Sequence, residues 1–260
     1  MRYSDHSPWP EGHPISRDKA KSLSEGSLGS FYKGFALSCS APLFWFRSND
    51  KPLRILHNGT ITIVRTPRKL FGVTADHVID QYEIDRPEGI KLQIKTRMIR
   101  GPRIIDRSPK RDLATFELDK HVIADLGLQP IEWPFRLPSE GGGLLLAGFR
   151  GNSKEYIEPK QLGWSPFFAI GRARTVSLDQ ITILVPPDDD NANNSLPLNY
   201  DFGGISGGPI IGLFETASNV ACFRLSGVIT EQPSYDGSLD SIERIVGTSA
   251  EAITEFGMIR

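Results

Sequence analysis

The sequence predicts an all-β protein, either a sandwich or a barrel. Short runs of β-type residues recur along the chain and are separated by turn signals, in keeping with 25 glycines and 19 prolines. In "IKLQIKT", Ile90, Leu92 and Ile94 alternate with polar residues, so they should share one face of a strand. Helix signals are weak until the end of the chain, and no repeat of about 20 to 50 residues is evident.

The elements are expected in this order along the chain. Residues 1 to about 28 are polar, contain three prolines and are predicted to form a poorly ordered arm. Residues 74–82 fit a single helical turn, and 248–259 fit a C-terminal helix with Thr248 or Ser249 as N-cap. The Asp/Asn-rich segment 188–200 is interpreted as a surface loop; a calcium loop is the weaker alternative, because its glycine and distal glutamate spacing are missing. The predicted strands lie within 59–65, 69–78, 90–99, 113–119, 142–149, 174–185, 207–214 and 221–230.

Composition limits the classes of partner. The chain of 260 residues suffices for one large β domain or two small ones. Its 30 basic and 31 acidic residues nearly cancel, so we expect neither a nucleic acid nor a membrane as partner. Cys39 and Cys222 are the two cysteines; we expect both as small core residues and a bridge between them as the weaker alternative. With neither a signal-peptide pattern nor an apolar run of spanning length, a cytoplasmic location is expected; export after removal of a leader stays open.

The stretch "DFGGISGGPIIG" (201–212) surrounds one serine with glycines. Glycine loses more conformational freedom on folding than other residues, so such a cluster needs a backbone reason. A tight turn whose N–H groups point at a developing anion is one such reason. The G-x-S-x-G pattern is found at nucleophile elbows of α/β-hydrolases, but there the histidine follows the serine. All five histidines precede Ser206, which excludes that fold, and the strand-like continuation argues against a subtilisin-type site.

Three local patterns then fit together. His77 lies in "GVTADHV", Asp112 in "KRDLATFEL" and Ser206 in "GGISGGP". Their order and contexts resemble the trypsin/chymotrypsin-like serine peptidases, which carry T-A-x-H, D-[IL]-A and G-x-S-G-G-P. The resemblance covers about residues 30 to 255. Asp106 and Asp119 are rivals for the aspartate, but only Asp112 precedes the "LA" that returns the chain inward.

The resemblance implies a fold and a mechanism. The fold would be two six-stranded antiparallel β-barrels, at about 29–125 and 126–245, followed by the C-terminal helix. Ser206 would attack a peptide bond of a polypeptide substrate, with His77 as general base and Asp112 orienting it, and without metal or organic cofactor. The N–H groups of Gly204 and Ser206 would bind the oxyanion.

Alternatives to that mechanism stay open. A pseudoprotease that binds a peptide or partner is the first, and an esterase-like or self-cleaving protein is the second. The sequence indicates no oligomeric state. Gly207 and Gly208 are expected to let the next strand pass beneath His77, while His57 and His121 are expected at the surface.

The chain also departs from digestive trypsins. Ile205 replaces the aspartate that pairs with a cleaved N-terminus there, so no activation cleavage is expected. The chain therefore looks closer to bacterial, HtrA-like members. Only about 30 residues follow Thr230, so no PDZ-like module is expected.

The specificity pocket is less defined. Tyr200 is predicted at its floor, and Thr230, Glu231 and Gln232 along its wall. Neither Tyr200 nor Thr230 is a carboxylate, so a small or medium apolar substrate residue is predicted. Asp201 and Glu231 nearby keep a basic preference open.

Overall fold

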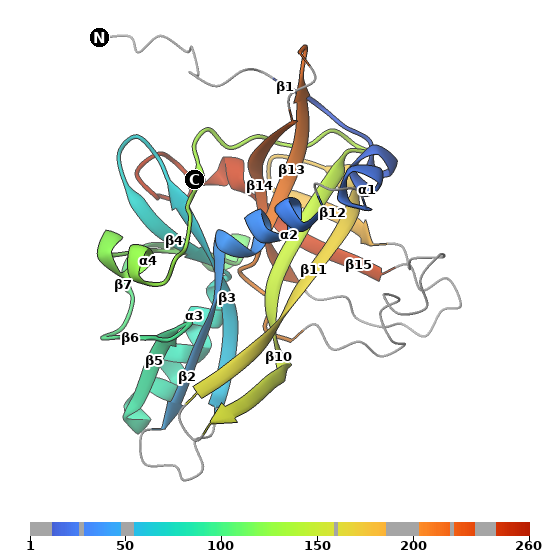
Figure 1. The fold of residues 1–260 in the computed structure, drawn as a ribbon. Coiled ribbons are helices and arrows are strands. Elements are labelled where there is room, and N and C mark those ends of the chain that lie inside the picture. Colours follow the sequence, from blue (N-terminus) through green and yellow to red (C-terminus); the bar gives the residue numbers. More distant parts are fainter. Residues whose placement is uncertain are drawn as a thin grey trace.

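The computed structural model describes residues 12–25, 29–47, 55–158, 161–185, 203–218, 221–231 and 243–260. Two β-sheets dominate it, which confirms the all-β prediction (Figure 1). The helices are α1 (Arg17–Glu25), α2 (Gly29–Ser38), α3 (Asp76–Asp85) and α4 (Lys120–Asp125), with 3₁₀ turns η1 (Arg86–Glu88), η2 (Pro109–Arg111) and η3 (Ala250–Ala252). None of the helices in these ranges is long and apolar enough to cross a membrane.

The first sheet comes from the N-terminal half of the chain. Its strand order is β6-β5-β2-β3-β4-β8-β7, and β9 pairs with β3 in parallel. The apolar alternation predicted at 90–94 is present, because Leu92 and Ile94 are buried in the core of this sheet. Its strands are β2 (Ser40–Arg47), β3 (Ile55–Arg65), β4 (Leu70–Thr74), β5 (Ile90–Ile94), β6 (Arg97–Ile99), β7 (Arg103–Ser108), β8 (Leu113–Glu117) and β9 (Ile131–Glu132).

The second sheet comes mainly from the C-terminal half. Six of its strands close into a ring, β13-β10-β11-β12-β15-β14, because β13 also pairs with β14. A separate apolar core fills this ring. Its strands are β1 (Gly12–Pro14), β10 (Gly143–Glu158), β11 (Gln161–Val176), β12 (Gln180–Val185), β13 (Pro209–Thr216), β14 (Ala221–Glu231) and β15 (Glu243–Ser249).

The predicted pair of six-stranded barrels therefore needs a correction in its strand counts. The second unit is a closed six-stranded barrel with β1 added beside β13. The first unit has eight strands, and within the described residues no pairing joins its end strands β6 and β7. The predicted strand region 90–99 forms a hairpin of two strands, β5 and β6, and the two-residue β9 has no strong sequence signature.

Both ends of the chain differ from the prediction. Residues 12–25 are not a disordered arm: β1 pairs with β13, and α1 buries Ala20. No C-terminal helix forms over 248–259; the first two positions end β15, which pairs with both β12 and β14. Only η3 follows, where the Ser249 hydroxyl accepts a hydrogen bond from the N–H of Glu251. Pairing along both edges of β15 outweighs the local helix signal.

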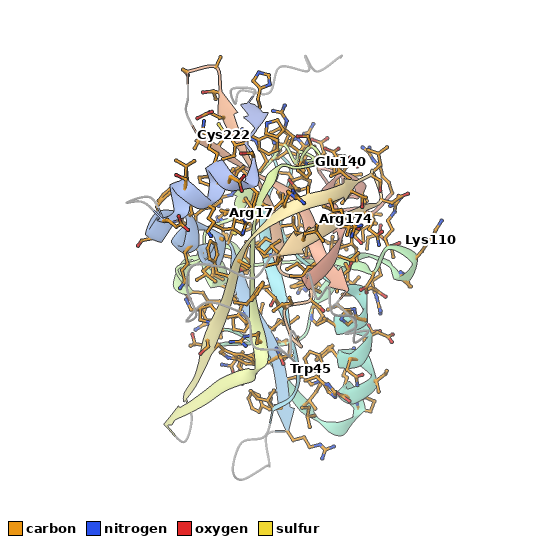
Figure 2. All side chains as sticks on the ribbon, turned by 90° about the vertical axis from the view of Figure 1, so that its right-hand side faces the viewer. Arg17, Trp45, Lys110, Glu140, Arg174 and Cys222 are labelled. Carbon is orange, nitrogen blue, oxygen red and sulfur yellow. The ribbon has the colours of Figure 1, made fainter. Side chains whose placement is uncertain are left out.

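A third core cluster joins the two sheets. It contains Val73 and Leu113 from the first sheet and Leu145 and Ile211 from the second. Cys39 also lies in this cluster, and Cys222, partly exposed, lies in β14 near the upper end of the molecule (Figure 2). Neither cysteine forms a disulfide, so the alternative of a bridge is wrong, and the prediction of a core residue is correct for Cys39.

Candidate active site

His77 lies in the first turn of α3, directly after strand β4. The predicted single turn is in fact a helix that continues to Asp85. The N-cap position, Ala75, has no side chain that could accept from the free N–H groups of this turn. A distant residue replaces the cap, because the His77 N–H donates to Oδ1 of Asp112 at 2.9 Å.

Asp112 makes a second contact with the same residue. Its Oδ2 lies 2.7 Å from Nδ1 of the His77 ring. Asp112 follows η2 in a left-handed conformation, with φ of 50°, which few residues other than Gly, Asn and Asp adopt readily. The two contacts fix both the backbone and the ring of His77 relative to one carboxylate, and they leave Nε2 as the outward ring nitrogen.

This carboxylate also changes the ionisation of the ring. The pKa of His77 is raised above its ordinary value, chiefly because Asp112 bonds to the charged ring. Burial acts in the opposite direction, and the charges of Asp112 and Asp76 add to the increase.

Ser206 comes from the second sheet, in the turn that precedes β13. This turn has positive φ at Gly204 (+97°) and Gly207 (+92°). A Cβ at Gly207 would lie 1.9 Å from the carbonyl oxygen of Thr60, and one at Gly204 would lie 2.0 Å from Nδ2 of Asn58. Backbone conformation and lack of space therefore both require glycine at these positions.

Threonines of the first sheet hold this turn by hydrogen bonds. The hydroxyl of Thr60 donates to the carbonyl of Gly204, and that of Thr62 donates to the carbonyl of Gly207, each at 2.8 Å. The Thr60 N–H donates to the carbonyl of Ser206, also at 2.8 Å. Along β3 these threonines alternate with Ile61 and Ile63, which face the core of the first sheet. The sequence analysis missed this role, although the alternation "TITI" is visible in the sequence.

The prediction for Gly207 and Gly208 needs a correction. A Cβ at Gly207 would meet the carbonyl oxygen of Thr60, and a Cβ at Gly208 would meet that of Ala147. The two glycines therefore let the turn approach strands β3 and β10, whereas the prediction had them let the next strand pass beneath His77. The N–H groups of Gly207 and Gly208 donate to the carbonyls of Ile229 and Ile205.

The N–H groups of Gly204 and Ser206, in the same turn, differ from those of Gly207 and Gly208 in their hydrogen bonding. No described group accepts a hydrogen bond from the N–H of Gly204 or of Ser206. Ser206 itself is 2% exposed, and its Oγ has no hydrogen-bond partner among the described residues. The turn thus presents two amide donors and one hydroxyl that the described part of the chain leaves unused.

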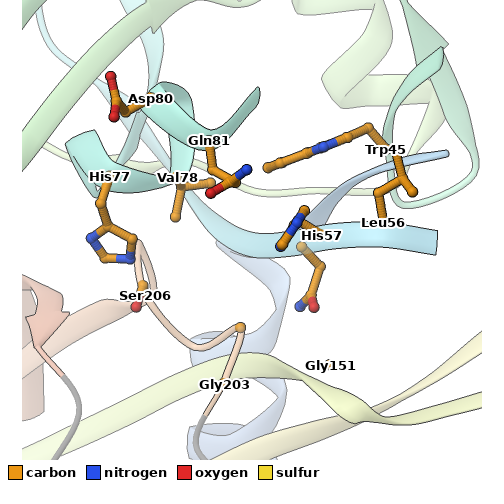
Figure 3. Close-up of a pocket in the computed structure, with 12 residues that line it drawn as sticks. Trp45, Leu56, His57, His77, Val78, Asp80, Gln81, Gly151, Gly203 and Ser206 are labelled. Atoms are coloured by element: carbon orange, nitrogen blue, oxygen red, sulfur yellow. The ribbon is translucent and has the colours of Figure 1, made fainter. Parts of the chain in front are cut away.

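A cleft of about 500 Å³ brings these parts together. His77 and Ser206 both line it, and Figure 3 shows the His77 ring pointing toward Ser206. The structure therefore brings His77, Asp112 and Ser206 together from two sheets. The cleft continues to residues that the sequence analysis did not place in a site: Trp45, Leu56, His57, Asn58, Val78, Asp80, Gln81, Gly151 and Gly203.

The rival aspartates have structural partners elsewhere. Asp106 accepts hydrogen bonds from the N–H groups of Arg107 and Ile259, and Asp119 caps α4 through the N–H of His121. His57 is half-exposed, as expected, but it lines the cleft.

The predicted specificity residues are less well placed. Thr230 is buried in β14 and does not belong to the described residues that line the cleft. Glu231 ends β14, whereas Tyr200, Asp201 and Gln232 lie outside the described residues, as does the segment 188–200. The predicted pocket wall and floor stay predictions.

Comparison with known proteins gives similar structures only. No family model and no curated protein matches the chain. A crystal structure of the serine protease domain of the Sesbania mosaic virus polyprotein is 14% identical, with a TM-score of 0.43, over 80% of this chain and 86% of that one. A structure from work on aromatic interactions in the folding and binding of the disordered VPg protein of that virus is 14% identical, with a TM-score of 0.44, over 82% and 92%. At this level of similarity, neither structure assigns a chemistry to the cleft residues of this chain.

Proposed function

We propose that this protein is a serine endopeptidase. The observation that carries the proposal is the two-point contact of His77 with Asp112, at 2.7 and 2.9 Å, in the cleft that Ser206 lines from the opposite sheet. A serine hydroxyl is a weak nucleophile at neutral pH and needs a base within hydrogen-bond reach. An imidazole held by a carboxylate on one nitrogen offers its other nitrogen for that purpose.

The reaction would proceed in two steps. In the first, Nε2 of His77 takes the Ser206 proton while Oγ attacks the carbonyl carbon of a peptide bond. The N–H groups of Gly204 and Ser206 bind the oxyanion, and the proton passes from His77 to the leaving amine as the C–N bond breaks. In the second, water gives a proton to His77 and attacks the acyl carbon; the bond to Oγ breaks, and the proton passes from His77 back to Ser206. Neither step requires a metal or an organic cofactor.

The chain order His-Asp-Ser and the closed second barrel support a chymotrypsin-like form of this chemistry. The resemblance to bacterial, HtrA-like members without a PDZ module, and the preference for a small or medium apolar residue before the cleaved bond, stay predictions. The polypeptide substrate is part of this proposal.

A fluorophosphonate probe tests the proposal. The wild-type protein should form a covalent adduct that mass spectrometry locates on Ser206, and Ser206→Ala should not be labelled. Ser139→Ala is the matched control, because Ser139 is exposed and outside the cleft, and it should label like wild type. A folded wild-type protein that stays unlabelled would contradict the proposal.

A second candidate is a silent pseudoprotease that binds a peptide or a partner. One observation favours it: Ser206 Oγ is buried and has no hydrogen-bond partner within the described residues, so no base touches it in this conformation. This candidate would be favoured over the enzyme if the probe does not label the protein and the protein binds an extended peptide that a second peptide displaces.

A further inference from the structure

Asp76, the residue before His77, is a buried carboxylate with one dominant partner. It is 5% exposed and lies in the first turn of α3. Nε of Arg107 donates to its Oδ1 at 2.6 Å, and Nη2 donates to its Oδ2 at 3.1 Å. A carboxylate at such depth is costly unless it is paired, so this two-pronged contact is what allows Asp76 to lie there in its charged form.

The same guanidinium contacts further acidic residues of the helix. Nη1 of Arg107 donates to Oε2 of Glu83 at 2.7 Å, and Nη2 lies 3.6 Å from Oδ1 of Asp80. Positions 76, 80 and 83 lie on one face of α3, where like charges repel each other. Arg107, which lies outside the helix, offsets the negative charge of this face.

Arg107 also belongs to the hairpin that carries Asp112. It lies in β7 and pairs with Ala114 of β8, and η2 and Asp112 form the connection between the two strands. The hairpin therefore holds the start of α3 at two adjacent points. Asp112 binds the backbone and ring of His77, and Arg107 binds the preceding side chain, Asp76.

We infer that Arg107 is a positioning residue of the active site: through Asp76 it fixes His77 against Asp112, and its charge offsets that of Asp76 beside the base. The inference rests on the proposed function for its kinetic consequences. The charges that act directly on the His77 ring are those of Asp112, from the β7–β8 hairpin, and Asp76, from α3. Arg107 of the same hairpin contacts Asp76 and Asp80, and Asp80 and His57 line the cleft with His77. The turn 203–208 contains no charged residue.

Asp76 and Arg107 carry opposite charges, so removing each charge should shift the pKa of His77 in opposite directions. Asp76 raises the pKa of His77 by its charge, so Asp76→Asn should move the pH midpoint of activity down. Arg107→Gln leaves that charge uncompensated, so the midpoint should move up. Arg107→Lys keeps the charge but loses the two-pronged geometry, so it should keep the midpoint and lose rate.

The experiment measures kcat against pH for these three variants, with Arg103→Gln as matched control. Arg103 lies on the same strand, is 87% exposed and faces Glu117 rather than α3, so its removal should change neither kcat nor midpoint. Arg107→Gln and Arg107→Lys should lose about 10- to 100-fold in kcat, because small misplacements of a catalytic group cost that much. The inference is overturned if the pH midpoints of Asp76→Asn and Arg107→Gln both equal that of the wild type, or if both shift in the same direction.

A second measurement separates this inference from the proposed function. NMR titration of the His77 ring in a Ser206→Ala background reports the same opposite shifts without turnover. If wild type lacks activity but the ring shifts occur, the electrostatic part of the inference stands and the peptidase proposal fails. If the ring pKa is the same in all folded variants, the inference is wrong whatever the activity.

Discussion

The two halves of the candidate site are built by different physical means. On the first sheet, His77 is held by charged groups, with Asp112 on its ring and backbone and Asp76 paired to Arg107 beside it. On the second sheet, Ser206 lies in a turn without charged residues. That turn is fixed by neutral hydrogen bonds from Thr60 and Thr62 and by the close fit of its glycines.

This difference matches what the proposed reaction would require of each half. A base must change its charge during the reaction, so its surroundings have to control a charge. The serine turn must offer two N–H groups in a fixed geometry to a charge that exists only transiently, and rigid neutral packing does that without binding a competing anion beforehand. Substitutions should therefore distinguish the two halves. The His77 half should respond to changes in charge and pH, and the Ser206 half to changes in side-chain volume and to loss of hydroxyl groups.

The largest effect is expected in the charged half. Asp112→Asn preserves the size of the side chain but no longer fixes the tautomer of His77, and kcat should fall by about 10⁴-fold. Steady-state kinetics on a peptide substrate measures this. Asp125→Asn is a suitable control, since the Asp125 side chain is more than half exposed and pairs with Arg97 at 3.7 Å, away from the cleft, and it should keep wild-type kcat. Near-normal turnover of Asp112→Asn would remove Asp112 from the mechanism.

The next effect is expected in the neutral half and concerns stability. Gly207→Ala places a Cβ against the carbonyl of Thr60 at a φ of +92°, and we expect a loss of about 3 kcal/mol in the free energy of unfolding. Gly127→Ala is the control. Gly127 also has a positive φ, of +64°, but a Cβ there meets nothing within 4 Å, so only the backbone cost of about 1 kcal/mol should remain. Urea unfolding of both variants tests the difference, and equal losses would show that close packing does not constrain the turn.

The same contrast explains how much could be predicted from the sequence. The all-β class and the meeting of His77, Asp112 and Ser206 were predictable, because short motifs in a fixed order mark the three residues. Local patterns also identified the glycine turn, since the need for positive φ belongs to a few consecutive residues.

What could not be predicted depends on contacts between distant segments. Arg107 reaches α3 from another strand, 31 positions away from Asp76, and its own sequence context is an ordinary strand. Thr60 binds a turn 144 positions later. The predicted C-terminal helix failed for the same reason, because β15 finds partners on both sides that no local signal shows.

A smaller effect should follow from loss of one hydroxyl at the junction. The Thr60 hydroxyl donates to the carbonyl of Gly204 and accepts from the N–H of Phe149 at 3.0 Å, so Thr60→Val removes this hydrogen-bond partner from one buried and one partly buried group. We expect about 2 kcal/mol less stability and a reduced kcat without a change in its pH midpoint. Thr60→Ser keeps the hydroxyl and should retain most of both. A shifted midpoint in Thr60→Val would show that the two halves are electrostatically coupled after all.

The smallest expected effect is the pH response of stability, which should distinguish the halves in one experiment. Because the pKa of His77 is raised on folding, its stabilising contribution is complete below the unfolded-state pKa of about 6.5 and is lost as the pH rises through the higher folded-state pKa. Activity should change in the opposite direction over the same range, since the base must be neutral. Unfolding measured from pH 5 to 9 should show this loss in wild type and in Ser206→Ala, but not in His77→Gln. An equal slope in all three proteins would mean that His77 does not report the charge of its surroundings, and the contrast between a charged and a neutral half would fail.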